Sequence, residues 1–315
     1  MEPKRIVILA GGWSGEREVS LNSGAQCAQA LARAGHDLVV IDPARELPRL
    51  VDLAPSLDAV LILLHGPFGE DGRVQGLLDC LGLPYPGAGV ASSVISIDKA
   101  LSKERYLEAG LKVAPDVTLL AGQAGREKDL VNELGLPFIV KPAREGSTLG
   151  LTLVENEEDL APALETAFSH DDKVIVEKYL AGTELTAGVL DLPGQGLTAL
   201  PVIEIRPKRS NLFNYECKYT PGACEEICPA PISQAASLKA QAAALTAHQV
   251  LGISHWSRTD FILVEEEIYV LETNTIPGMT VTSLFPQAAA AAGLSLDRLL
   301  ERLVELAIRD RGPKA

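Results

Sequence analysis

Basic residues are scarce in this sequence of 315 residues, in which 28 lysines and arginines stand against 42 aspartates and glutamates. The formal net charge is therefore −14. Proteins that bind nucleic acid depend on clustered lysine and arginine side chains that neutralise the phosphate backbone. The charge balance argues against a nucleic-acid partner.

Long apolar segments are absent as well. The strongest apolar runs cover only residues 6–10 and 59–64, whereas a helix needs about 20 apolar residues to cross a bilayer. The N-terminal run ends in a glycine-rich turn, unlike the longer apolar core of a secretory signal. We therefore expect no membrane partner and a cytoplasmic location.

Cysteine is equally sparse, with five residues in the whole chain. Small secreted domains that are held together by disulfides carry more cysteine for their length. Hydrophobic residues make up 47% of the chain and charged residues 22%, as in ordinary globular proteins. This length and composition predict two or three folded domains rather than a disordered polypeptide.

Apolar segments alternate with helical ones in the first third of the chain. We expect strands at residues 5–10, 37–41 and 59–64. Strands in this order with short connections favour a parallel sheet that helices cover on both faces. Ligands of such sheets bind beyond the carboxyl ends of the strands, where residues 11–16 and 65–71 lie.

A proline-containing stretch at residues 84–87 marks a candidate boundary. After it we expect a helix over residues 92–110 and strands at 137–141, 149–154, 174–180, 184–190, 200–205, 259–264 and 268–272. The chain is thus predicted to be an α/β protein with an N-terminal parallel-sheet domain and two α+β domains. The expected domains are residues 1–92, 93–183 and 184–315.

Two strands with an acidic turn between them form the most informative segment, at residues 258–277. If this hairpin is centred on Glu266, Asp260 lies opposite Glu272. Two opposed carboxylates repel each other, and a cation bound between them would reverse that effect. Because Mg²⁺ commonly takes one or two carboxylates together with substrate phosphates, the pair is a candidate metal site.

Arg258 and Asn274 form the next pair on the same face in this register, because side chains two residues apart point to the same side of a strand. The amide oxygen of Asn274 would suit the same ion. The alternative is a solvated polar face in another register, because a slip of one residue would separate the two carboxylates.

A strand that ends at Lys141 is followed by a loop that contains glycine and serine, over residues 144–150. The backbone N–H groups of such a loop can bind phosphate, with the lysine as a point charge. The segment is not a P-loop, because no G-x-x-x-x-G-K-[ST] sequence occurs and a strand follows. An ordinary hairpin with a long loop is the alternative.

The glycine-rich turn at residues 11–16 does not match the G-x-G-x-x-G of dinucleotide-binding proteins. Glu16 would crowd a pyrophosphate there, and its carboxylate is better placed to receive a substrate ammonium group. Alternatively, it is an acidic residue that a helix N-terminus favours. For four further polar residues, the alternative to a functional role is a structural or solvent-exposed one: His65, Lys99, Glu177 and Glu184.

Seven separated segments point to one family. They lie at residues 11–24, 64–90, 97–103, 140–150, 176–186, 214–222 and 257–284, and include GGWSGEREVSLNSG, VKPAREGSTLG and LETNTIPGMTVTSL. In this order they resemble the D-alanine–D-alanine ligase family of the ATP-grasp superfamily over nearly the whole chain. The resemblance implies an ATP-dependent ligase that joins two D-alanines through an acyl phosphate for peptidoglycan precursor synthesis. It also implies a homodimer.

The resemblance further implies that ATP lies between the central and C-terminal domains. Lys99 and Lys141 match the lysines that hold its phosphates, and residues 146–150 match the loop that closes over them. The adenine hinge is matched by Glu177, Lys178, Tyr179 and Leu180, and the ribose-binding acid by Glu184. Two magnesium ions, for which Mn²⁺ is an expected substitute, would be bound by Asp260, Glu272 and Asn274.

Substrate roles follow from the same resemblance. Glu16 matches the residue that binds the ammonium group of the first D-alanine, and Ser147 and Tyr219 match its hydrogen-bonded partners. Arg258 and the backbone of Gly278 match the hydrogen-bond donors that stabilise the tetrahedral intermediate in the family. The site for the second carboxylate is matched by Ser283 and Leu284, and the substrate pocket also contains a histidine that matches His65.

Two alternatives to this ligase remain. One is a related ligase that uses D-lactate or D-serine as the acceptor, although Tyr219 and its neighbours resemble the amide-forming branch. The other is a nucleotide-binding regulator without turnover, against which the full set of metal, phosphate and oxyanion positions argues.

Overall fold

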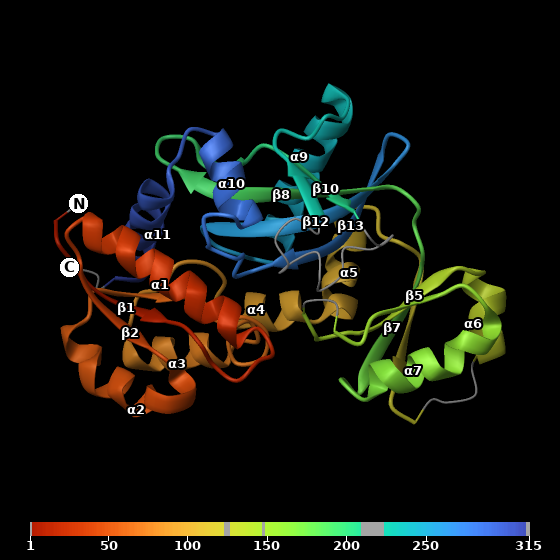
Figure 1. Cartoon of the computed structure of the whole chain (residues 1–315), viewed down its shortest axis with the longest axis horizontal. Coiled ribbons are helices and arrows are strands. Elements are labelled where there is room, and N and C mark those ends of the chain that lie inside the picture. Colours follow the sequence, from red (N-terminus) through yellow and green to blue (C-terminus); the bar gives the residue numbers. More distant parts are fainter. Residues whose placement is uncertain (1, 123–126, 147–148, 209–223, 313–315) are drawn as a thin grey trace.

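The computed structural model describes residues 2–122, 127–146, 149–208 and 224–312. Three sheets organise this part of the chain, at the left, the lower right and the top of Figure 1. Among the described residues, no helix is long and apolar enough to span a bilayer. The domain boundaries expected at residues 92/93 and 183/184 stay a prediction.

The first sheet is parallel, with the strand order β2-β1-β3. It contains β1 (Arg5–Leu9), β2 (Asp37–Ile41) and β3 (Ala59–Ile62), and it packs with α1 (Arg17–Arg33), α2 (Pro43–Leu53), α3 (Arg73–Leu81) and α11 (Leu296–Arg311). Ile6 and Ile8 enter the core with α1 and α11, whereas Val7 and Leu9 enter the core with α2 and α3. The predicted parallel sheet with two covered faces is therefore confirmed.

Two helices stand where the sequence predicted one, α4 (Val90–Ile97) and α5 (Lys99–Glu108). Asp98 separates them because its backbone is extended, with ψ of 102°, and its side chain accepts from the N–H groups of Ala100 and Leu101. An aspartate in this position caps the second helix and ends the first. The expectation of a single helix over residues 92–110 was thus wrong.

The second sheet is antiparallel, with the order β4-β7-β5-β6. It consists of β4 (Asp116–Leu120), β5 (Phe138–Pro142), β6 (Thr152–Val154) and β7 (Lys173–Lys178). Val174 and Val176 pack with α6 (Glu127–Leu134) and α7 (Leu160–Phe168) on one face. Because side chains alternate along a strand, Glu177 of β7 points to the other face, away from this core.

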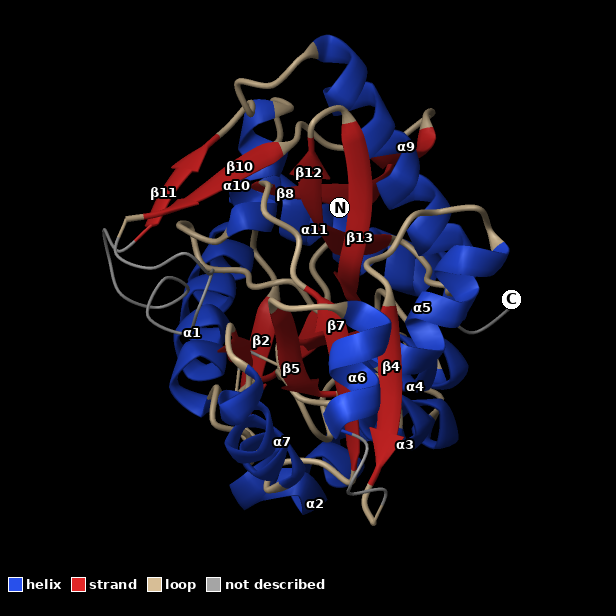
Figure 2. Cartoon of the chain, turned by 90° about the vertical axis from the view of Figure 1, so that its right-hand side faces the viewer, coloured by secondary structure: helices blue, strands red, loops and turns tan. Residues whose placement is uncertain are grey.

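The third sheet is also built from antiparallel pairs, in the order β11-β10-β8-β12-β13, and β9 pairs with β8 (Figure 2). Its strands are β8 (Thr183–Leu192), β9 (Gly196–Ala199), β10 (Ile203–Pro207), β11 (Cys224–Ile227), β12 (Trp256–Val264) and β13 (Glu267–Asn274). Five alanines of α9 (Gln234–Val250) pack against one face. The small alanine side chains let this helix approach closely, and the other face carries the polar residues of the hairpin.

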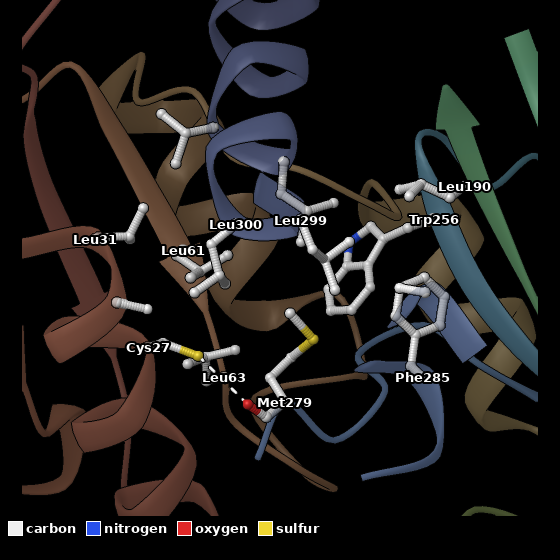
Figure 3. Close-up of a cluster of buried hydrophobic side chains, with 14 of the residues drawn as sticks. Cys27, Leu31, Leu61, Leu63, Leu190, Trp256, Met279, Phe285, Leu299 and Leu300 are labelled. Atoms are coloured by element: carbon white, nitrogen blue, oxygen red, sulfur yellow. Dashed lines mark hydrogen bonds between the residues drawn. The ribbon is translucent and has the colours of Figure 1, made fainter. Parts of the chain in front are cut away.

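An apolar cluster joins the parallel sheet to the C-terminal part of the chain (Figure 3). Within it, the rings of Trp256 and Phe285 meet edge to face, with centroids 5.2 Å apart. Phe285 belongs to α10 (Leu284–Ala291). The thiol of Cys27 on α1 lies 3.6 Å from the carbonyl oxygen of Met279. The cluster therefore fixes the N-terminal turn relative to the hairpin that carries Asp260.

Replacing Trp256 by alanine should lower the free energy of unfolding by about 3–5 kcal/mol, because a large buried aromatic side chain leaves a cavity. Urea denaturation followed by circular dichroism measures the change. Leu238→Ala is the control, since Leu238 on α9 is 58% exposed. Equal stability of the two variants would contradict the role of Trp256 in joining the sheets.

Candidate active site

A cleft lies between the polar faces of the two antiparallel sheets. Apolar side chains contribute to its wall: Ala114, Ile139, Leu149, Leu151, Ile262 and Leu271. Every residue that the sequence predicted for ATP binding also lines it: Lys99, Lys141, Glu177, Lys178, Tyr179, Leu180 and Glu184. Apolar walls with a few charged groups are what a nucleotide base and its phosphates require.

The hairpin of β12 and β13 has the predicted pairs. Asp260 lies opposite Glu272, and Arg258 lies opposite Asn274. The two carboxylates also line the same cleft as Lys99 and Lys141. The solvated face in another register, which the sequence left open, is thus excluded.

The turn of this hairpin differs from the prediction. Val264 pairs with Glu267, so the turn contains two residues and is not centred on Glu266. Regular pairing from this turn would place Leu271 opposite Asp260 and send the next side chain to the other face. A β-bulge leaves Leu271 unpaired and restores the predicted register at the site.

Asp260 is buried and receives several donors. Arg258 donates from Nε and Nη2 over 2.9 and 2.8 Å, and the hydroxyl of Thr186 donates over 2.6 Å. The Nδ2 atom of Asn274 donates over 3.1 Å. These contacts hold the carboxylate in one orientation on the cleft wall.

Glu272 is balanced by a lysine from a distant segment. Its carboxylate lies 3.1 Å from the Nζ atom of Lys99, which also donates to the carbonyl oxygen of Glu145 over 2.7 Å. The repulsion between the opposed carboxylates is therefore offset by side-chain cations. Lys99 is not the surface lysine that the alternative interpretation allowed, because it is buried in the cleft.

The donor set at the hairpin fits Mg²⁺. In the described ranges, no group of three or more His, Cys, Asp or Glu residues could hold a metal ion. Asp260, Glu272 and the amide oxygen of Asn274 supply a partial set of hard oxygen ligands. Mg²⁺ completes such a set with water and substrate phosphates, so this site would bind the ion together with a nucleotide.

Glu177 forms ion pairs with two lysines. Lys103 donates to its Oε2 atom over 2.8 Å, and Lys141 contacts its Oε1 atom. Burial opposes ionisation of Glu177, but the charges of Lys141 and Lys103 outweigh it and lower its pKa to about 2. The alternative that Glu177 is solvated is excluded. The sequence did not identify Lys103 as part of this site.

The rest of the predicted hinge is held by backbone contacts. Lys178 donates from Nζ to the carbonyl oxygens of Gly135 and Leu136 over 2.7 and 3.1 Å. The N–H group of Tyr179 donates to the carbonyl oxygen of Pro137. These bonds fix the end of β7, from which Tyr179 and Leu180 line the cleft.

The glycine-rich turn positions Glu16 at the start of α1. The N–H group of Gly12 donates to Asp42 over 3.0 Å, and Arg17 pairs with the same carboxylate. A side chain at Gly11, whose φ is +100°, would come within 2.7 Å of Asp42. Glycine is therefore required where the turn packs against this ion pair.

Glu16 faces residues from three other segments. A Cβ atom at Gly146 would lie 3.3 Å from its Oε2 atom, and one at Gly66 would lie 4.0 Å away. Burial lowers the pKa of His65, while Glu16 opposes this shift and Arg258 adds to it. The structure thus brings Glu16, His65 and Arg258 close together, and the net effect lowers the pKa of the imidazole.

Glu70 belongs to the same region and was not singled out from the sequence. Its Oε2 atom accepts from the N–H group of Gly66 over 2.7 Å. Burial, together with the charge of Glu16, raises its pKa to about 8. A carboxyl group in this environment stays protonated near neutral pH. Only the packed structure shows this, because its neighbours come from separate segments.

Gly278 and Ser283 lie side by side before α10. A Cβ atom at Gly278 would come within 3.0 Å of the hydroxyl oxygen of Ser283, which also accepts from the N–H group of Thr280 over 3.1 Å. Leu284 is the first residue of α10. Ser147 and Tyr219 lie outside the described residues, so their roles stay predictions.

Comparisons with known proteins identify the family of this chain. A family model described as the D-ala D-ala ligase C-terminus matches residues 106–305, and one described as the D-ala D-ala ligase N-terminus matches residues 46–88. A protein named D-alanine--D-alanine ligase from Syntrophobacter fumaroxidans is 49% identical over 98% of this chain and 99% of its own length. The chain belongs to the D-alanine–D-alanine ligase family.

Solved structures of this family agree with the fold. The D-alanine--D-alanine ligase from Bacillus anthracis complexed with ATP is 32% identical, with a TM-score of 0.85 over 98% of both chains. The VanG D-Ala:D-Ser ligase from Enterococcus faecalis is 30% identical, with a TM-score of 0.83 over 97% of this chain and 100% of its own. The ATP-grasp fold implied by the sequence resemblance is confirmed.

Replacing Glu70 by glutamine should raise the melting temperature more at about pH 8.5 than at about pH 5. The folded pKa of Glu70 is about 8, above the ordinary value of 4.5. Its ionisation at high pH therefore opposes folding, whereas below 4.5 it is neutral in both states. Glutamine keeps an acceptor for Gly66. A stability difference that does not grow with pH would contradict the raised pKa.

Proposed function

We propose that this protein joins two molecules of D-alanine to D-alanyl-D-alanine and uses ATP to drive the reaction. The supporting observation is the cleft in which Asp260 and Glu272 face the phosphate-site lysines Lys99 and Lys141. Relatives named D-alanine--D-alanine ligase at 42–49% identity agree with this chemistry. In a cell, such a product would serve peptidoglycan precursor synthesis.

The first step of this reaction has to activate a carboxylate, which is a poor electrophile. Transfer of the γ-phosphoryl group of ATP depends on positioning and charge neutralisation. Lys99 and Lys141 would hold the phosphates, while the hinge at residues 177–180 would hold the adenine and Glu184 the ribose. Mg²⁺, held by Asp260, Glu272 and Asn274, would supply further neutralisation of the phosphate charge.

The second step joins the two amino acids. Glu16 would bind the ammonium group of the first D-alanine, and Arg258 with the N–H group of Gly278 would stabilise the oxyanion as it develops. The N-terminus of α10, at Ser283 and Leu284, would bind the carboxylate of the second D-alanine. Water has to be excluded from the acyl phosphate, which is the role we assign to the loop at residues 146–150.

A second candidate acceptor is D-serine, because the VanG D-Ala:D-Ser ligase shares the fold at 30% identity. The proposal also includes a homodimer, a cytoplasmic location and Mn²⁺ as a substitute ion.

Phosphate release from Mg²⁺-ATP should require D-alanine and should give a product with the mass of D-alanyl-D-alanine. The assay compares D-alanine alone with mixtures of D-alanine and D-serine or D-lactate, and product masses are recorded for each. A preference for a mixed product would show that D-serine or D-lactate, rather than D-alanine, is the acceptor. No amino-acid-dependent release from folded protein would refute the ligase reaction.

Glu272→Gln should lower kcat by about 10²–10³-fold with the fold retained, because the transferring phosphoryl group loses charge neutralisation. A titration with Mg²⁺ at saturating ATP measures this effect. The matched control is Glu267→Gln on the same strand, since Glu267 pairs on the surface with Lys112 and Lys239. Wild-type rates in Glu272→Gln at saturating Mg²⁺ would contradict the metal assignment.

A further inference from the structure

Lys103 is a buried cation to which the proposed reaction gives no role. Its side chain is 3% exposed, and it donates to Glu177, Asp116 and the carbonyl oxygen of Ala114 over 2.8, 2.7 and 3.1 Å. The ammonium group therefore has an acceptor for each of its three protons. Burial alone would lower its pKa, but the two carboxylates outweigh that effect and raise it.

The two lysines that contact Glu177 differ in their surroundings. Lys141 lines the cleft, whereas Lys103 is not among the residues that line it. Asp116, Lys103, Glu177 and Lys141 follow one another in a row of alternating charge. If Lys141 turns to the phosphates of a nucleotide, Lys103 is the cation that stays with Glu177.

The protonation state of Glu177 decides which purine it can bind. A carboxylate only accepts hydrogen bonds, so it suits the 6-amino group of adenine. Opposite a 6-oxo purine, the carboxylate and the 6-oxo oxygen would both be acceptors with no hydrogen between them. A buried acceptor without a donor is costly. A protonated carboxyl group could instead donate to the 6-oxo group. A buried carboxyl group that loses its neighbouring cations takes up a proton.

We propose that Lys103 is a positioning residue that holds Glu177 as a carboxylate while Lys141 serves the phosphates, and that it thereby sets the preference for a 6-amino over a 6-oxo purine. This inference rests on the proposed function, in which Glu177 contacts the adenine ring. A merely structural Lys103, which ties α5 to the second sheet, would affect all nucleotides equally.

The central experiment uses Lys103→Gln, which removes the charge and keeps a hydrogen-bond donor. The ratio of kcat/KM for ATP to that for inosine triphosphate should fall at least about tenfold in this variant near neutral pH. The ratio should recover as the pH rises from about 6 to about 9, because Glu177 then ionises again. In the wild type it should stay constant over this range. An equal loss for both nucleotides would overturn the proposal.

A binding measurement tests the same point without turnover. Isothermal titration calorimetry with ADP and with inosine diphosphate, in the absence of D-alanine, should show the same loss of discrimination in Lys103→Gln. Lys103→Arg keeps the charge and should restore the wild-type ratio. Unchanged discrimination in folded Lys103→Gln would overturn the proposal.

Lys173→Gln is the matched control. Lys173 lies on the same strand as Glu177, and its Nζ atom donates to Asp98 over 2.6 Å. Its replacement breaks a partly buried ion pair between β7 and the cap of α5 without touching Glu177. The melting temperature should fall, and the ratio between the two nucleotides should not change. A changed ratio here would overturn the assignment to Lys103.

Glu177→Gln keeps the test decisive if Lys103→Gln does not fold. An amide can donate as well as accept, so this variant should discriminate poorly between the nucleotides, at every pH. Wild-type discrimination in it would overturn the proposal. If the wild type forms no D-alanyl-D-alanine, the proposed function fails, and the calorimetric comparison still tests Lys103. If the wild type forms the product but replacing Lys103 does not change the ratio between the two nucleotides, only this inference fails.

Discussion

Two lysines one helical turn apart on α5 neutralise carboxylates that belong to two different sheets. The Nζ atom of Lys99 lies 3.1 Å from Glu272 on β13, and that of Lys103 lies 2.8 Å from Glu177 on β7. Residues four apart share one face of a helix, so α5 presents one cation to each of the two sheets. Because a buried charge is tolerated only when it is paired, α5 supplies one carboxylate of each sheet with a cation that it needs.

Each antiparallel sheet divides its side chains between a core and the cleft. The apolar face of the second sheet packs on α6 and α7, and that of the third packs on α9. Strict alternation along β13 would send Leu271 to the cleft and Glu272 to the core. The bulge at Leu271 lets both face the cleft, so one irregular residue decides whether the second carboxylate reaches the site.

Three carboxylates of the cleft wall are each paired with a cation that the proposed reaction needs for another purpose. Arg258 holds Asp260, Lys99 holds Glu272, and Lys141 contacts Glu177. In the proposed reaction, Lys99 and Lys141 would contact the phosphates, and Asp260 and Glu272 would hold Mg²⁺. Such an exchange replaces one ion pair by another and avoids leaving a buried charge alone. The proposed reaction does not assign Glu177 to the metal, so its second cation, Lys103, is the partner that remains when Lys141 turns to the phosphates.

Local patterning in the sequence determined the strands of the parallel sheet, because spacing is a property of adjacent residues. It also predicted the Asp260–Glu272 pair, but from a turn centred on Glu266, and the pair forms only because of the bulge at Leu271. The residues that line the cleft were implied by the family resemblance. Tertiary structure decided the bulge at Leu271, whereas the break at Asp98 follows from a local helix cap that the prediction of a single helix overlooked. It also decided the pairing of Lys103 with Glu177, which are 74 residues apart. Burial and long-range ion pairs depend on how distant segments pack together, and no local propensity contains that information.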